Sequence, residues 1–144
     1  MTVVLDTGPL VAALHLGDPL RPRALELLGQ VWRGKFGVPV APDTVLDEGL
    51  TLLRRRPGRA DVSRAFCDYF LPEAGTPPLL LRTTTSDLLK RAADLHFRFY
   101  DRALSFTDCT LLAHVEATGG VLATFDGGFA GLCPLAAATP ERSE

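Results

Sequence analysis

Short apolar runs alternate along the chain with longer stretches in which apolar residues recur every three or four positions. The three- and four-residue spacing predicts amphipathic helices, and the short runs between turn residues predict strands. We predict strands over residues 2–5, 38–40, 79–81 and 121–124, of which the first and third have the composition of buried strands. We predict helices, with their caps, over residues 10–14, 23–32, 43–55, 60–70, 84–99 and 105–119.

The alternation of strands and helices defines the expected fold class. Strands that are joined through helices pair in parallel, and helices cover both faces of a parallel sheet. The expected class is therefore α/β, with a short parallel sheet at its centre. Ligands of such sheets bind beyond the carboxyl ends of the strands, so we expect functional residues just after the strands.

The overall composition narrows the class of protein. The 144 residues suit one domain, which we place at residues 1–138, with a flexible polar tail at 139–144. The formal net charge of −2 gives no general basic character, so any binding of nucleic acid must depend on local features. Three widely spaced cysteines, no secretory signal and no apolar stretch long enough for a membrane span predict a soluble, cytoplasmic protein.

Two acidic residues stand at the ends of predicted strands. Asp6 directly follows the first strand, and Asp126 follows the last strand with one residue between. Each has a structural alternative, since aspartate favours helix caps and tight turns. Because parallel strands end at the same edge of a sheet, the two carboxylates are nevertheless expected to lie at one edge.

Glu48 lies inside a predicted helix and shares one face with Val45, Gly49 and Leu52. That face is expected to be directed toward the core. A buried carboxylate without a partner is costly, so it needs a cation, a proton or a metal ion. The alternative is a rotated helix that leaves Glu48 at the boundary of the core, paired with an arginine.

Asp108 shares a helical face with Leu111 and Leu112, which again indicates a carboxylate directed inward. The segment that begins at Ser105 also has the form of a capping box, so Asp108 is alternatively a helix cap. Asp101 is a fifth candidate, for which we favour a solvated loop.

Carboxylates gathered at one edge repel one another unless cations intervene. Hard divalent ions such as Mg²⁺ or Mn²⁺ prefer oxygen ligands, and the histidines and cysteines form no pattern that favours zinc. Among the histidines, we expect His114 to lie on the surface of its helix. Divalent ions activate water and stabilise phosphoryl oxygens, which makes phosphodiester cleavage a candidate reaction.

The order of these motifs resembles the PIN domain, and most of all the VapC-type toxins of bacterial toxin–antitoxin modules. The matching features are Leu5-Asp6-Thr7 after a strand, Glu48 within a helix, the segment 104–108 (Leu-Ser-Phe-Thr-Asp) and the segment 123–129 (Ala-Thr-Phe-Asp-Gly-Gly-Phe). The resemblance extends from Met1 to about Leu135. No single motif is specific, but their order and spacing together are.

The resemblance implies a three-layer α/β/α sandwich and an endoribonuclease that hydrolyses RNA phosphodiester bonds with Mg²⁺ or Mn²⁺. It also implies a homodimer and an antitoxin that blocks the site. The implied metal site comprises four acids, of which the first and third most often contact the ion directly: Asp6, Glu48, Asp108 and Asp126. Thr124, and with it Thr7, would support the site. Gly127-Gly128 departs from the family pattern, which often has polar or basic residues there.

RNA also requires cations, and a run of arginines follows the Glu48 helix: Arg54, Arg55 and Arg56. They are candidates for phosphate contacts, and the alternative is a solvated helix end. The alternative function is a non-catalytic PIN-like module that binds RNA or protein. A receiver domain would need adjacent acids after the first strand, and a haloacid-dehalogenase phosphatase would need D-x-D there, where this chain has Asp6-Thr7-Gly8.

Overall fold

The computed structural model describes residues 1–56 and 58–138. Its centre is a parallel sheet of four strands in the order β3-β2-β1-β4. The strands are β1 (Thr2–Leu5), β2 (Val38–Pro42), β3 (Leu80–Arg82) and β4 (Val121–Ala123). Val3 pairs with Pro39 on one side and with Val121 on the other, so the first strand is central. The predicted parallel sheet is confirmed.

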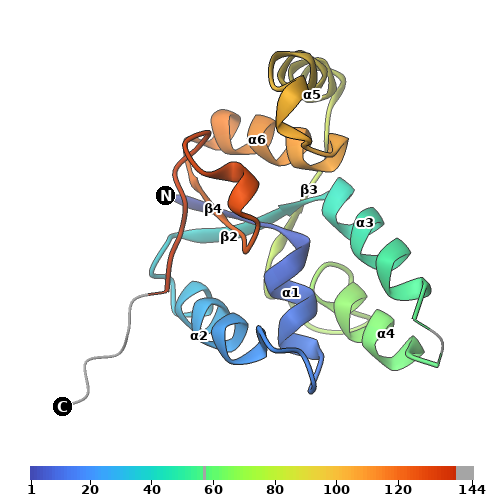
Figure 1. The fold of residues 1–144 in the computed structure, drawn as a ribbon. Helices are drawn as coiled ribbons and strands as arrows, with labels where there is room; N and C mark the ends of the chain where they lie inside the picture. Colours follow the sequence, from blue (N-terminus) through green and yellow to red (C-terminus); the bar gives the residue numbers. More distant parts are fainter. Residues whose placement is uncertain (57, 139–144) are drawn as a thin grey trace.

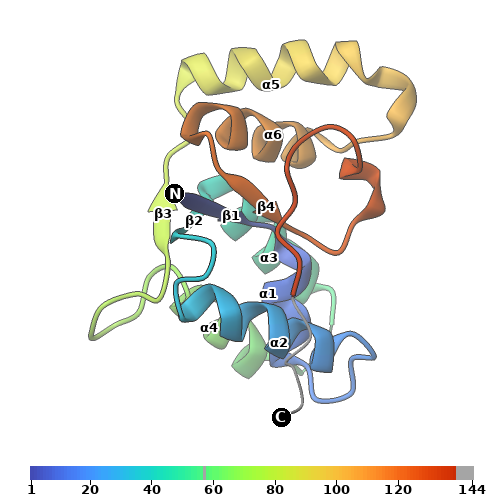
Figure 2. The same ribbon diagram turned by 90° about the vertical axis from the view of Figure 1, so that its left-hand side faces the viewer.

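Six α-helices surround the sheet in the described part of the chain, with two short 3₁₀ helices, Tyr100–Arg102 and Gly127–Phe129. The α-helices are α1 (Thr7–Leu14), α2 (Arg21–Trp32), α3 (Asp43–Arg54), α4 (Ala60–Asp68), α5 (Ser86–Arg98) and α6 (Phe106–Thr118). Helices α5 and α6 form a layer on one face, whereas α1, α2 and α4 lie on the other (Figures 1 and 2). The expected three-layer α/β/α arrangement is therefore confirmed.

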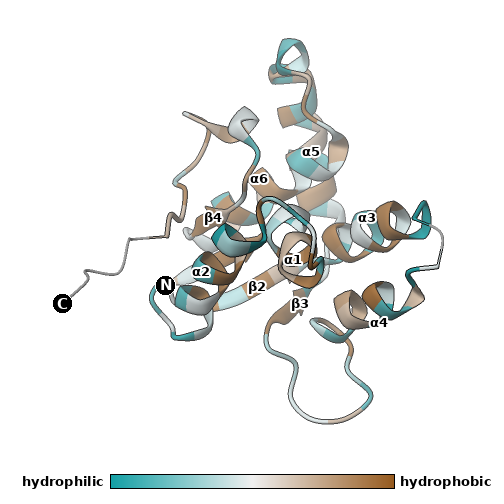
Figure 3. Ribbon diagram, turned by 60° about the horizontal axis from the view of Figure 1, so that its bottom comes forward, coloured by the Kyte–Doolittle hydropathy of each residue, from teal (hydrophilic) through white to brown (hydrophobic). Residues whose placement is uncertain are grey.

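The buried core joins the two helix layers through the sheet. Val3, Val4 and Leu5 of the central strand are fully buried, and so are the rings of Phe66 and Phe129. On helices such as α2 and α3, hydrophobic and hydrophilic residues occupy different sides (Figure 3). Burial of the apolar sides against the sheet is the main stabilising contribution of these helices.

The strand predicted at residues 79–81 is present, but the prediction that it is buried is wrong. Only Leu79 is buried, and it precedes the strand, whereas Leu80 and Leu81 are 48% and 37% exposed. The reason is that β3 is an edge strand with a single neighbour. The other edge is extended by residues near the C-terminus, because Ala136 N–H donates to the Leu122 carbonyl and Leu122 N–H donates to that of Pro134.

The expectation that His114 lies on a helix surface is also wrong. Its side chain is buried in α6, and Nε2 lies 2.9 Å from the hydroxyl of Thr84. That hydroxyl donates to the Asp43 carboxylate, so it accepts from the ring nitrogen. Burial lowers the pKa of His114. This chain of hydrogen bonds links three elements that are distant in sequence.

Two further expectations concern a C-terminal tail and membrane-spanning segments. The flexible tail at 139–144 lies outside the described residues. In the part of the chain that the structure describes, no helix is both long and apolar enough to cross a membrane.

Candidate active site

The four acids singled out from the sequence line one pocket of about 640 Å³. They come from four different places in the fold: the end of β1, the middle of α3, the first turn of α6 and the loop after β4. The pocket lies beyond the carboxyl ends of β1 and β4, where the parallel sheet predicts a ligand site. The structure thus brings Asp6, Glu48, Asp108 and Asp126 together.

Asp6 is the most buried of these acids, with 7% of its surface exposed. It is the N-cap of α1, and its Oδ1 accepts from Thr7 N–H at 2.7 Å. Its Oδ2 accepts from the Thr124 hydroxyl, also at 2.7 Å. The same carboxylate therefore caps α1 and lines the pocket, and its two hydrogen bonds hold it in position.

Burial raises the pKa of Asp6 to about 6, and repulsion from Asp108 and Glu48 adds to the effect. The hydrogen bonds from Thr124 and Thr7 oppose the rise in pKa, because they favour the charged form. A carboxylate kept in such a place at a free-energy cost is a candidate for function rather than for stability.

Glu48 lies at the edge of the buried face of its helix. That face consists of Val45, Gly49 and Leu53, whereas Leu52, which we expected on it, is 46% exposed. The helix is therefore rotated, as in the alternative interpretation. The partner in the described structure is the Thr7 hydroxyl, which donates to Oε2 at 2.9 Å, and not an arginine. Burial raises the pKa of Glu48, with repulsion from Asp108 as a further cause.

Asp108 combines both of its predicted roles. Its Oδ2 accepts from Ser105 N–H at 2.9 Å, and its own N–H donates to the Ser105 hydroxyl at 3.1 Å, which is a complete capping box. The carboxylate also lines the pocket, where burial and then repulsion from Asp126 raise its pKa. The capping box therefore positions the carboxylate at the pocket.

Asp126 is exposed and likewise combines a turn with the pocket. Its Oδ1 accepts from Gly128 N–H at 2.8 Å, and its N–H donates to the Thr124 hydroxyl at 3.0 Å. That hydroxyl also donates to Asp6, so Thr124 connects two of the four acids. Asp101 is exposed in the 3₁₀ helix after α5 and does not line this pocket.

The oxygen atoms that line the pocket are of the kind that a hard divalent cation binds. The pocket collects carboxylate and hydroxyl oxygens, and mutual repulsion contributes to the raised pKa of Asp6, Glu48 and Asp108. A divalent cation would relieve that repulsion. Within residues 1–56 and 58–138, however, no three acidic, histidine or cysteine side chains already stand close enough together to hold an ion.

The arginine run divides between two hollows. Arg55 and Arg56 line the acidic pocket, and a guanidinium nitrogen of Arg56 also contacts Nε2 of His15. Arg54 lines a different hollow, between α3 and α4, which Arg55 also borders. Phe125 also lines the acidic pocket and was not predicted there, although it stands between two predicted site residues in the sequence.

Comparisons with known proteins agree with this architecture. Residues 3–133 match the PIN domain family. The structure of VapC20 from Mycobacterium tuberculosis, a toxin that cleaves the sarcin–ricin loop, is 28% identical, with a TM-score of 0.73 over 89% of this chain and 92% of that chain.

A second solved structure supports the fold alone. It is VapBC2 from Rickettsia felis, bound to a DNA fragment from the VapBC2 promoter. The identity is 18%, and the TM-score is 0.66 over 94% of this chain and 98% of that chain. No curated protein sequence matches the chain. From the family match over most of its length and the likeness to a VapC toxin, the chain belongs to the PIN domain family.

Proposed function

We propose that the protein is an Mg²⁺- or Mn²⁺-dependent endoribonuclease and the toxin of a type II toxin–antitoxin pair. The observation that carries the proposal is the meeting of four carboxylates from distant segments in one pocket. The likeness to a toxin that cleaves the sarcin–ricin loop supports this reaction class. A cognate antitoxin, a homodimer and a cytoplasmic location are further parts of the proposal.

Asp6 and Asp108 are the proposed principal metal ligands, and Glu48 and Asp126 complete the site. When bound, the ion lowers the pKa of water and neutralises charge on the phosphoryl oxygens. The Thr7 and Thr124 hydroxyls keep Glu48 and Asp6 oriented, because each donates to one of these carboxylates. Their role is positioning.

The chain supplies a base and cations beside the proposed metal site. Glu48 is the proposed acceptor of a proton from the attacking water, since its half-buried carboxylate lines the pocket and is oriented by the Thr7 hydroxyl. Arg55 and Arg56 line the same pocket and are the proposed contacts for the phosphates next to the scissile bond.

Cleavage of a pool of structured RNAs, with Mg²⁺, with Mn²⁺ and with EDTA, tests the proposal. We expect cutting with either metal, none with EDTA, and losses of at least about 100-fold in Asp6→Asn and Asp108→Asn, since even supporting residues of metal sites are worth 10- to 100-fold. Asp101→Asn is the matched control, because Asp101 is exposed and outside the pocket.

Wild-type rates in both Asp6→Asn and Asp108→Asn would show that the site assignment is wrong. A folded, antitoxin-free wild-type protein that neither cuts RNA nor binds metal would instead support the non-catalytic binding module.

A further inference from the structure

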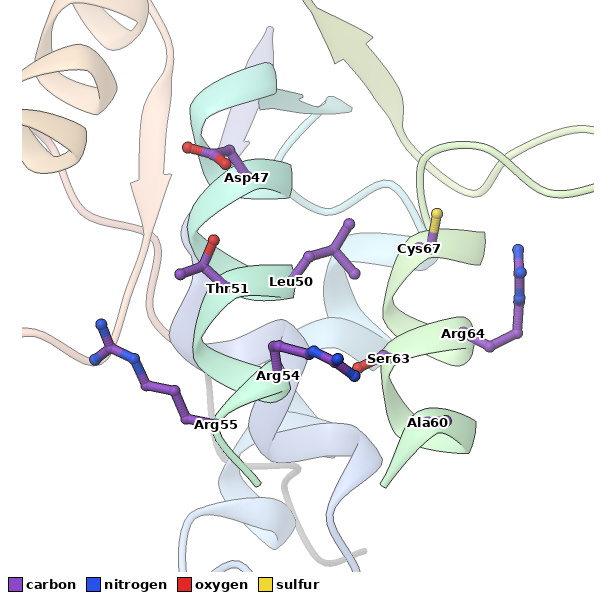
Figure 4. Close-up of a pocket in the computed structure, with 9 residues that line it drawn as sticks. All are labelled: Asp47, Leu50, Thr51, Arg54, Arg55, Ala60, Ser63, Arg64 and Cys67. Atoms are coloured by element: carbon purple, nitrogen blue, oxygen red, sulfur yellow. The ribbon is translucent and has the colours of Figure 1, made fainter. Parts of the chain in front are cut away.

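A second hollow, of about 720 Å³, lies between α3 and α4 (Figure 4). Three arginines from the two helices line it, together with the hydroxyls of Thr51 and Ser63. The arginines are Arg54 and Arg55 at the end of α3 and Arg64 in α4. We call this hollow the α3–α4 groove.

The groove is cationic at one end. Arg54 is directed from α3 toward Ser63 on α4, and Arg55 and Arg64 lie on either side of it (Figure 4). Asp47, the acidic residue of the lining, lies toward the other end of α3 (Figure 4). A polyanion would therefore cross the helices at the arginine end.

The arginines of the groove have no carboxylate partner among the described residues. Arg54, Arg55 and Arg64 are exposed and form no ion pair there, although Arg64 also lines a smaller hollow together with Asp68 and Glu73. Two other arginines differ in this respect: Arg59 pairs with Asp61 at 3.6 Å, and Arg91 pairs with Glu116 at 2.8 Å. The cations of the groove are therefore available to an external anion.

The groove and the acidic pocket share one residue. Arg55 lines both hollows, so they adjoin at the end of α3. A nucleic-acid strand whose phosphodiester bond lies among the carboxylates must continue over the neighbouring surface. The α3–α4 groove is a neighbouring surface that offers unpaired cations.

We propose that the α3–α4 groove holds the single-stranded RNA that flanks the cleavage site, with backbone phosphates at Arg54 and Arg64. This inference rests on the proposed ribonuclease function and adds to it a path for the substrate. An acidic polypeptide would satisfy the same cations. RNA is favoured because the groove adjoins the pocket in which the proposed reaction occurs, and because three arginines and only one acidic residue line it.

The test is the salt dependence of binding of a fluorescein-labelled, mixed-sequence, single-stranded oligoribonucleotide, measured by fluorescence anisotropy in EDTA. For single strands the slope of log affinity against log salt is about −0.7 for each phosphate contact. The double variant Arg54→Ala, Arg64→Ala should therefore bind more weakly, with a slope reduced in magnitude by about 1.4.

Two further double variants serve as controls. Arg59→Ala, Arg91→Ala removes the same charge from paired arginines outside the groove and should leave the wild-type slope. Arg54→Lys, Arg64→Lys keeps the charge and should restore most of the slope, which separates phosphate contact from a folding defect.

The inference is overturned if the groove variant keeps the wild-type slope, if the wild-type protein does not bind the RNA, or if a polyglutamate peptide binds the groove more tightly than RNA. Because EDTA suppresses cleavage, binding is read independently of catalysis. A reduced slope supports the RNA path even if the cleavage experiment fails, and an unchanged slope removes the path even if cleavage succeeds.

Discussion

At the scale of single residues, the candidate site uses the same atoms for structure and for chemistry. Asp6 caps α1 and accepts from Thr124, and Asp108 completes the capping box of α6. Backbone N–H groups at the start of a helix stabilise an anion, which partly offsets the cost of burying these carboxylates. Local capping thus places charge at the pocket.

Replacement of Asp6 by asparagine should stabilise the metal-free protein at neutral pH. Because the pKa of Asp6 is raised from 3.8 to about 6, ionisation costs folding free energy as pH rises through this window, and the cost is complete above it. At about 1.4 kcal/mol per pH unit, Asp6→Asn should be up to about 3 kcal/mol more stable at pH 7.5.

Urea unfolding at pH 7.5 and pH 4 measures this difference, which should nearly vanish at the lower pH. Asp101→Asn, at an exposed position, should change stability by less than about 0.5 kcal/mol at both pH values. A loss of stability in Asp6→Asn that is equal at the two pH values would contradict the assigned cause.

At the scale of elements, the packing of α3 against α4 sets the orientation of Glu48 and forms the α3–α4 groove. Gly49 makes the close approach possible, because a Cβ at this position would overlap the ring of Phe66. Phe66 is fully buried, so its ring has little space to move.

Gly49→Ala should destabilise the protein by about 1 to 3 kcal/mol, since overpacking outweighs the gain of up to about 1 kcal/mol in helix propensity. Gly29→Ala in α2 is the matched control. Its Cβ would meet only the flexible end of the Arg33 side chain, at 3.3 Å, so stability should be unchanged or higher. Urea unfolding followed by circular dichroism measures both, and equal effects in the two variants would contradict the packing argument.

The periodicity of the sequence predicts the helices and strands, but it does not fix which face of a helix is buried. Every predicted strand and helix is present, and Ser105 and Gly119 bound α6 as expected. Helix α1 begins earlier than predicted, at Thr7, because the Asp6 side chain caps it. The spacing of Val45 and Gly49 is compatible with either Leu52 or Leu53 on the buried face, and only the packing of α3 in the folded molecule selects Leu53.

At the scale of the whole molecule, the pocket is completed by segments that are more than a hundred residues apart. Thr124 bonds to Asp6 across the β1–β4 pair, and the Thr7 hydroxyl bonds to Glu48. The site therefore exists only in the folded chain. An ion that binds it should stabilise the folded state by mass action.

Saturating Mg²⁺ or Mn²⁺ should raise the melting temperature of the wild-type protein by several degrees, because an ion at 100 times its dissociation constant contributes about 2.7 kcal/mol. The double variant Asp6→Asn, Asp108→Asn should lose this increase, and Asp101→Asn should retain it. Differential scanning calorimetry measures the shifts. An equal increase in wild type and double variant would place the ion elsewhere.

The sequence by itself determined the elements, their parallel pairing and the four acids that line the pocket, because periodicity, caps and strand ends are local features. Only the tertiary structure decided the rotation of α3, the exposure of β3 at the sheet edge, the burial of His114 and the absence of Arg54 from the acidic pocket that Arg55 and Arg56 line. Each of these depends on contacts between distant segments, and several arrangements of such segments satisfy the same local pattern.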